Sequence, residues 1–183
     1  MSDNYIFESE RLGFREWTEN DSDFFAQMNS NEQVMKYMLK PLNREESDDS
    51  LKRIMNHFDN HGYGLYAVEL KSTNGLIGFI GFQIATFYAH FTPCIEIGWR
   101  LDSQYWNQGY GTEGARRVFE YGVSNLNFRK MYSFTSLLNE PSIHIMEKIG
   151  LQRIEEFDHP KIPDKNPLKK HVLYGAINHN YRK

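Results

Sequence analysis

Apolar residues recur along this chain with two different spacings, which predict strands and helices in alternation. Stretches in which apolar residues alternate with polar ones or run together, rich in β-branched and aromatic types, predict strands. Seven such stretches occur, at residues 5–15, 63–70, 76–87, 94–101, 130–137, 151–157 and 171–177. The second and third are joined by a turn at residues 72–75, whose Asn-Gly pair is a strong signal of a β-hairpin.

Helices are predicted where apolar residues lie three and four positions apart. The best defined helix spans residues 44–61, where apolar side chains share one face and Gly62 follows as a helix terminator. Further helices are expected from Thr18 onward, at residues 32–39, at 112–126 and at 139–149. A proline-rich stretch, residues 158–168, reads as an ordered surface loop. With no internal repeat or linker, the elements predict a single α/β domain over residues 1–183.

Composition narrows the class of protein. Of the 183 residues, 40% are hydrophobic and 15% aromatic, which is typical of a globular protein with a packed core. The net charge is −3 and the densest basic cluster is Lys169-Lys170-His171, so no nucleic-acid binding is expected. No apolar run approaches the roughly 20 residues of a membrane span, and no membrane association is expected either.

Cysteine and histidine usage points to a reducing compartment without a metal. The single cysteine, Cys94, cannot form an internal disulfide, and no secretory signal pattern is present. A cytoplasmic location is therefore expected. The seven histidines show no metal-ligand spacing with this cysteine, and no metal is expected.

Residues 105–115, Tyr-Trp-Asn-Gln-Gly-Tyr-Gly-Thr-Glu-Gly-Ala, carry the strongest chemical signal. Gly109 and Gly111 lie where a strand pattern ends and a helical pattern begins. Glycine lets a ligand approach the backbone closely, and the free N–H groups and dipole of the following helix favour a negative charge. The segment therefore predicts a pyrophosphate site built from backbone amides. A P-loop is absent, and no glycine motif of a dinucleotide fold lies near the N-terminus.

Three blocks with a characteristic order and spacing surround this loop. They are Glu96-Ile97-Gly98-Trp99-Arg100-Leu101 with Tyr105-Trp106, then Gln108 to Ala115, then Asn139-Glu140-Pro141-Ser142 with Met146-Glu147-Lys148-Ile149-Gly150-Leu151. Across residues 96–151 the chain resembles the GNAT superfamily of N-acetyltransferases, and more narrowly the branch of the ribosomal-protein N-terminal acetyltransferases. Residues 11–15 resemble the first strand of that branch more loosely. Trp106 departs from the Arg or Gln of the wider superfamily, although an aromatic residue is usual in this branch.

The resemblance implies an α/β fold of the α+β type, with a central mixed, mostly antiparallel sheet of about seven strands flanked by helices. The sheet would be splayed between the fourth and fifth strands, and the pantetheine arm of acetyl-CoA would lie in the splay. The resemblance assigns cofactor contacts to the backbone of Trp99, Arg100 and Leu101 and to the amides of Gln108, Gly109, Tyr110, Gly111 and Thr112. Asn139 matches an asparagine that contacts the cofactor; it is also a good helix N-cap, and both roles can hold together.

The resemblance further implies acetyl transfer to a primary amine by direct attack, without a covalent enzyme intermediate. An alkyl ammonium, with a pKa near ~10, must first lose a proton to a base. Glu96 is the candidate base, and alternation along its strand places it on one face with Gly98 and Arg100. The alternative for Glu96 is a structural ion pair with Arg100. Ser142 matches a serine proposed as the acid for the leaving thiolate, with hydrogen bonding at the helix start as its alternative.

Two features are not accounted for by this assignment. His159 is expected to pack in its loop, whereas His171 could assist deprotonation or bind a carboxylate of the acceptor. The aromatic run at residues 87–91 could line an acceptor pocket or form a homodimer contact, or belong to the core.

The sequence thus predicts an acetyl-CoA-dependent N-acetyltransferase whose acceptor is a protein N-terminus or a small-molecule amine. A catalytically silent CoA-binding sensor or partner domain is the alternative from another class, and it would bind CoA without turnover. A nucleotide-binding module is the third reading, and it would bind ATP or NAD at least as well as CoA.

Overall fold

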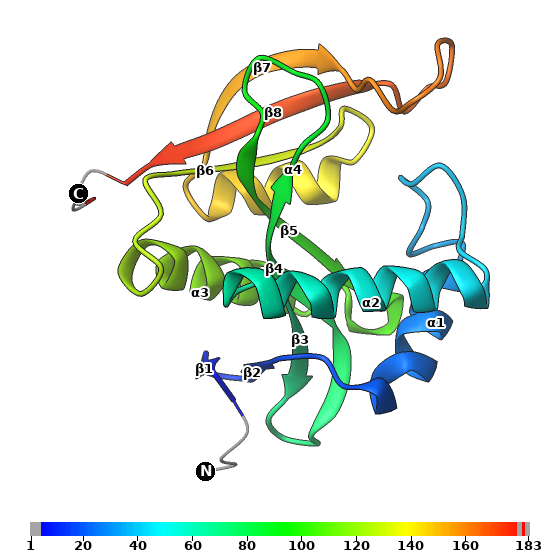
Figure 1. Ribbon diagram of the computed structural model, residues 1–183, viewed down its shortest axis with the longest axis vertical. Coiled ribbons are helices and arrows are strands. Elements are labelled where there is room, and N and C mark those ends of the chain that lie inside the picture. Colours follow the sequence, from blue (N-terminus) through cyan, green and yellow to red (C-terminus); the bar gives the residue numbers. More distant parts are fainter. Residues whose placement is uncertain (1–4, 179–180, 182–183) are drawn as a thin grey trace.

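The computed structural model describes residues 5–178 and residue 181. Its centre is one eight-stranded sheet in the order β1-β2-β3-β4-β5-β6-β8-β7 (Figure 1). The strands are β1 (Phe7–Glu8), β2 (Leu12–Arg15), β3 (Leu65–Leu70), β4 (Gly75–Ala85), β5 (Cys94–Leu101), β6 (Lys130–Ser136), β7 (Gln152–Asp158) and β8 (Lys170–Ile177). All neighbours are antiparallel except the parallel pair β5 and β6. The expected mixed, mostly antiparallel sheet is confirmed.

Four α-helices flank the sheet in the described part of the chain: α1 (Ser22–Ser30), α2 (Arg44–His61), α3 (Tyr110–Ser124) and α4 (Glu140–Lys148). Single 3-10 turns, η1 (Glu19–Asp21) and η2 (Ser103–Tyr105), precede α1 and α3. α3 lies so close to one face of the sheet that a Cβ on Gly114 would come within 2.3 Å of Ile80. α1 covers the other face, with the Phe25 ring 6.1 Å from that of Phe79. None of these helices is long and apolar enough to cross a membrane.

α2 extends from α1, on one face of the sheet, toward α3, on the other face. It begins with a capping box between Asn43 and Glu46 and ends at Gly62, which has a left-handed φ of 72°, so the predicted helix 44–61 is confirmed at both ends. Its first half packs on α1, and Figure 1 shows its last turns reaching toward the side of α3. There the Phe58 ring lies 5.1 Å from Tyr66, a side chain that is almost fully buried.

Two expected elements are wrong. Residues 5–15 form two antiparallel strands rather than one, because the chain reverses at residues 9–11, where Ser9 and the Arg11 amide bond to Glu113 of α3. The sheet accordingly has eight strands instead of about seven. Residues 32–39 are turns rather than a helix. The Asn31 side chain accepts the N–H of Gln33 at 2.9 Å as a helix N-cap does, but the backbone bonds that follow are mainly those of turns, from Lys36 to Gln33 and from Met38 to Met35.

Candidate active site

β5 and β6 touch at one point and then separate. Their single registered pair in the described residues joins Glu96 and Tyr132. Beyond Glu96, β5 continues to Leu101, so its edge toward β6 has no strand partner along that length. An unpaired strand edge can bind an extended ligand through backbone hydrogen bonds. These are the two strands that the sequence predicts to splay, and the predicted cofactor contacts at Trp99, Arg100 and Leu101 lie on the free edge.

The end of β5 is fixed by the residue that departs from the superfamily pattern. The indole Nε1 of Trp106 donates a hydrogen bond to the carbonyl of Leu101 at 2.9 Å. The Leu101 carbonyl therefore already has a donor, and the free backbone groups for a ligand are those of the preceding residues.

The glycine loop leads into α3 with unpaired amides. Asn107 and Gly109 have left-handed φ angles of 60° and 85°. The N–H of Glu113 donates to the Gly109 carbonyl at 3.0 Å, and this is the first hydrogen bond of the helix. The amides of residues 110–112 have no acceptor among the described residues, and no side chain caps this end. Such a helix start offers donors and a positive dipole end to an anion.

Arg11, at the turn between β1 and β2, holds the glycine loop in place. Its Nε donates to Glu113 Oε2 at 2.6 Å, and its Nη1 donates to the Gln108 carbonyl at 3.1 Å. The guanidinium also lies 4.4 Å from the centre of the Tyr110 ring. Although burial raises the pKa of Glu113, the hydrogen bonds from Ser9 and Arg11 hold it below its ordinary value. The sequence gives no signal for this brace, because it joins segments far apart in the chain.

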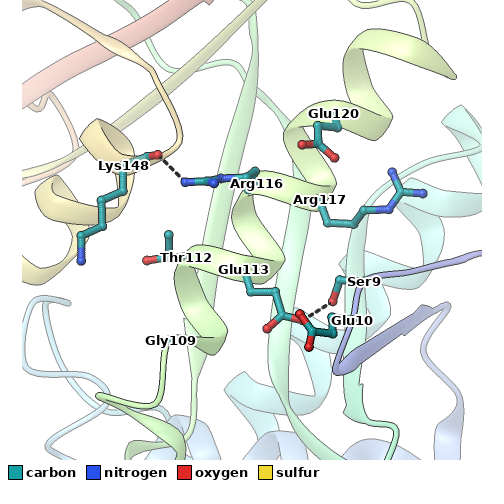
Figure 2. Close-up of a pocket in the computed structure, with 9 residues that line it drawn as sticks. All are labelled: Ser9, Glu10, Gly109, Thr112, Glu113, Arg116, Arg117, Glu120 and Lys148. Carbon is teal, nitrogen blue, oxygen red and sulfur yellow. Dashed lines mark hydrogen bonds between the residues drawn. The ribbon is translucent and has the colours of Figure 1, made fainter.

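A pocket of about 590 Å³ opens beside this helix start (Figure 2). It is lined by Ser9, Glu10, Gly109, Thr112, Glu113, Arg116, Arg117, Glu120 and Lys148. Arg116 Nη2 donates to the Lys148 carbonyl at 2.8 Å and so ties α3 to the end of α4. Figure 2 shows Lys148 extending along the side of α3 that carries Thr112. Sequence reasoning missed Arg116 and Lys148; the one available signal was that Arg116 follows Thr112 by one helical turn.

Few interactions offset the burial of the Glu96 carboxylate. Its side chain is only partly exposed, and burial raises its pKa to about 7. The hydrogen bond from Gln83 Nε2, at 2.9 Å, counteracts this shift only in part. The alternative ion pair with Arg100 is not formed in the described residues, because Arg100 donates instead to Asn29 Oδ1 at 2.7 Å. A carboxyl group with a pKa near 7 can exchange a proton with an amine at neutral pH.

Ser142 and Asn139 begin α4. Asn139 caps the helix, since its Oδ1 accepts the Ser142 N–H at 3.3 Å, and its Nδ2 donates to Thr135 Oγ1 at 2.9 Å. The N-cap role is therefore confirmed, while the cofactor contact of Asn139 stays a prediction. The Ser142 hydroxyl has no hydrogen-bond partner in the part of the chain that is described, so it is free to donate to a ligand. No hydrogen bond joins Ser142 to Glu96.

His159 and His171 lie in an aromatic cluster over β6, β7 and β8. The two rings are 4.9 Å apart, and His159 lies 4.5 Å from the Phe87 ring. Burial and the neighbouring His171 lower the pKa of His159 to about 4, and burial also lowers that of His171. Both rings are therefore neutral at pH 7. Alternation along β6 and the Glu96–Tyr132 pair place this cluster on the same face of the sheet as Glu96.

Comparison with known proteins agrees with this geometry. The family model described as "Acetyltransferase (GNAT) domain" matches residues 11–152. The chain is 30% identical to the uncharacterized N-acetyltransferase YnaD of Bacillus subtilis over 170 residues, which cover 92% of this chain and 95% of the relative. A solved structure of a GNAT-family acetyltransferase from Bacillus anthracis superposes with a TM-score of 0.78 at 26% identity, covering 93% of this chain and 97% of the other.

A more distant structure shares the fold. Spermidine N-acetyltransferase from Vibrio cholerae, solved with CoA and spermine, matches with a TM-score of 0.74 at 18% identity, over 93% of this chain and 98% of the other. The free strand edge, the uncapped helix start and the family match together define the class. The chain belongs to the GNAT family, and it is an N-acetyltransferase. Enzymes of this family transfer an acetyl group from acetyl-CoA to an amine.

Proposed function

We propose that the protein binds acetyl-CoA along the free edge of β5 and at the start of α3, and transfers the acetyl group to a primary amine by direct attack. The observation that carries the proposal is the pairing of two features on one strand: an edge without a partner, and Glu96 with a pKa near 7. The acceptor is a protein N-terminus or a small-molecule amine.

The cofactor site is assigned by its fit to an extended molecule with phosphates. The pantetheine arm would pair with the backbone of Trp99 and Arg100, and the pyrophosphate would accept from the amides of residues 108–112. The loop takes this shape because Gly109 has a left-handed φ of 85°, which favours glycine, and Gly111 lets α3 start close to α4, since a Cβ there would come within 3.0 Å of the Ile145 side chain. Arg116 and Lys148 supply positive charge for the remaining phosphate beside this helix start. Asn139 would contact the arm from the start of α4.

The chemistry requires the loss of two protons from the acceptor ammonium. Glu96 accepts the first, directly or through a water, and passes it to solvent. The amine nitrogen then attacks the thioester carbon, the C–N bond forms, and the C–S bond breaks. Ser142 donates its hydroxyl proton to the leaving sulfur and is reprotonated by the second proton from nitrogen. General base catalysis of this kind contributes about 10²–10⁴-fold to the rate.

The test is calorimetric titration of the purified protein with acetyl-CoA, with ATP and NAD as controls, followed by an amine-acceptor screen. Micromolar binding of acetyl-CoA alone, with turnover that falls in Glu96→Gln, supports the proposal. Binding of CoA with no turnover on any amine and no effect of Glu96→Gln would indicate a silent sensor domain instead. Binding of ATP or NAD at least as tight as that of acetyl-CoA would indicate a nucleotide-binding module.

A further inference from the structure

Arg100 is a half-buried cation without an anionic partner. It projects from β5 on the same face as Glu96, four residues further along the strand. Among the described residues no carboxylate lies within ion-pair distance of its guanidinium. Its polar partner is the neutral Oδ1 of Asn29, at 2.7 Å, and its guanidinium lies 5.3 Å from the centre of the Phe79 ring. Burial lowers the pKa of Arg100 to about 10.

Two other arginines have carboxylate partners. Arg15, which is also shielded from water, is bonded to both Asp21 and Glu69, and the more exposed Arg44 is paired with Asp23 and Asp48. A guanidinium removed from water without a counter-charge destabilises the fold. The guanidinium of Arg100 has five N–H donors in a planar fork. Among the described residues, one of them, on Nη1, donates to a side chain. The remaining donors are free to bind an oxyanion.

Asn29 holds the guanidinium in one orientation. Asn29 is fully buried in α1, and its Nδ2 donates to Ser47 Oγ at 3.0 Å, so that its Oδ1 points at Arg100. The backbone carbonyl of Asn29 accepts the N–H of Leu42 at 2.9 Å, which closes the base of the connection between α1 and α2. The buried amide of Asn29 therefore fixes the orientation of the Arg100 guanidinium, next to the start of the loop formed by residues 31–42.

We infer that Arg100 binds a carboxylate of the acceptor, and that the substrate class is an amine that also carries a carboxylate. The inference rests on the proposed function, because it takes Glu96 as the place where the amine reacts. The Cα atoms of Glu96 and Arg100 are about 13 Å apart along the strand, at roughly 3.3 Å per residue. With both side chains on one face, an acceptor whose amine and carboxylate are several bonds apart, as in the side-chain amine of lysine or a short peptide, would span the two groups. A polyamine would instead place its cationic amines beside the half-buried guanidinium of Arg100, which would repel them.

The experiment compares matched pairs of acceptors that differ only in the carboxylate. The pairs are L-lysine with cadaverine, 6-aminohexanoate with pentylamine, and a Ser-Glu-Ala tripeptide amide with its Ser-Gln-Ala counterpart. The first two place the carboxylate on a free small molecule, and the third places it on a peptide side chain. Each is assayed for kcat/KM with saturating acetyl-CoA, and for binding by calorimetry to the CoA-loaded protein. The variants are Arg100→Gln and Arg100→Lys, and the matched control is Arg53→Gln, an exposed arginine of α2.

We expect the wild type to prefer the carboxylate member of at least one pair by tenfold or more. Arg100→Gln should lose at least tenfold more kcat/KM on that member than on its partner, chiefly through KM, so that the preference for the carboxylate disappears. Arg100→Lys keeps the charge without the fork and should fall between the two, and Arg53→Gln should match the wild type. Since Arg100 has no anion in the free protein, Arg100→Gln should melt within a few degrees of the wild type.

Three results would overturn the inference while leaving the proposed function intact. One is equal kcat/KM for both members of every pair, and another is an equal loss on both members in Arg100→Gln. The third is acetyl-CoA binding with no detectable binding of any carboxylate-bearing amine. Failure to bind acetyl-CoA at all is a different result, because it rejects the proposed function and with it this inference.

Discussion

Glu96 gives the sharpest prediction about catalysis, because its pKa of about 7 sets where activity changes with pH. The carboxylate form is the base, so about one tenth of the enzyme is competent at pH 6, half at pH 7 and nine tenths at pH 8. An acceptor whose pKa is near ~10 is an ammonium ion throughout this range, and the Glu96 carboxylate takes its proton. A plot of log kcat/KM should therefore have a slope of about 1 below pH 7 and be flat between pH 7 and about 10.

Replacing Glu96 by Gln removes the break as well as the base. We expect kcat/KM to fall by about 10²–10³ at pH 8 and the slope to be about 1 throughout. The same substitution should lower activity but raise the stability of the folded protein. The folded pKa of about 7 lies above the ordinary 4.5, so wild-type stability falls as pH rises through this window. The full shift of the Glu96 pKa from 4.5 to about 7 corresponds to about 3 kcal/mol of folding free energy. Because the side chain is partly exposed, we expect the free energy of unfolding of Glu96→Gln to exceed that of the wild type by about 1–2 kcal/mol at pH 8, with no difference at pH 4.

Replacing Gln83 tests whether Glu96 acts as the base or has only a structural role. Its amide donates to the carboxylate and so stabilises the charged form. Gln83 is exposed and water can replace it, so Gln83→Ala should move the break upward by about 0.3–1 pH unit rather than by the full strength of a charged hydrogen bond. The matched control is Gln152→Ala on the edge strand β7, which should leave the break in place. An unmoved break in Gln83→Ala, or more than a tenth of wild-type activity in Glu96→Gln, would refute the assignment of Glu96 as the base.

Three further predictions concern the loop and the histidines. Gly109→Ala forces a side chain to φ 85°, at about 1–2 kcal/mol, and should weaken acetyl-CoA binding about tenfold by calorimetry. Glu113→Gln loses the charge bonded to Arg11. Because the folded pKa of Glu113 is depressed, urea unfolding should show about 1–2 kcal/mol lost at pH 7, and this difference should disappear as the pH falls through that folded pKa, below 4.5. His159→Gln should reduce the stability loss of the protein between pH 6.5 and about 4 by roughly 1–2 kcal/mol in the same assay, because the unfolded chain takes up that proton first.

The sequence predicts the fold wherever a local signal decides the structure. α2 is delimited by its capping box and by Gly62, and the turn between β3 and β4 is set by Asn74-Gly75. The failures lie where a distant partner decides. The reversal at residues 9–11 depends on Glu113, about a hundred residues later, and the connection after α1 is closed by a bond from Leu42 to the Asn29 carbonyl. No local pattern carries either contact.

The candidate site divides in the same way. The glycine loop could be found because its function depends on backbone geometry that glycine alone encodes. Arg11, Arg116 and Gln83 could not be found, because each acts through a side chain that reaches another element. Gln83 comes closest to being predictable. The Asn-Gly hairpin fixes the pairing of β3 and β4, but it leaves the register between β4 and β5 open. That register is what brings Gln83 opposite Glu96.

Glu96 and Arg100 show why a strand can carry two opposite charges that do not cancel. They share a face of β5, and an ion pair would return Glu96 to a low pKa and block the free donors of Arg100. Each is instead held by a neutral amide, Gln83 for the carboxylate and the buried Asn29 for the guanidinium. An amide fixes the direction of a charged group without supplying a counter-charge. Both charges therefore remain available, the carboxylate for a proton and the guanidinium for an anion, at the two ends of one short stretch of strand.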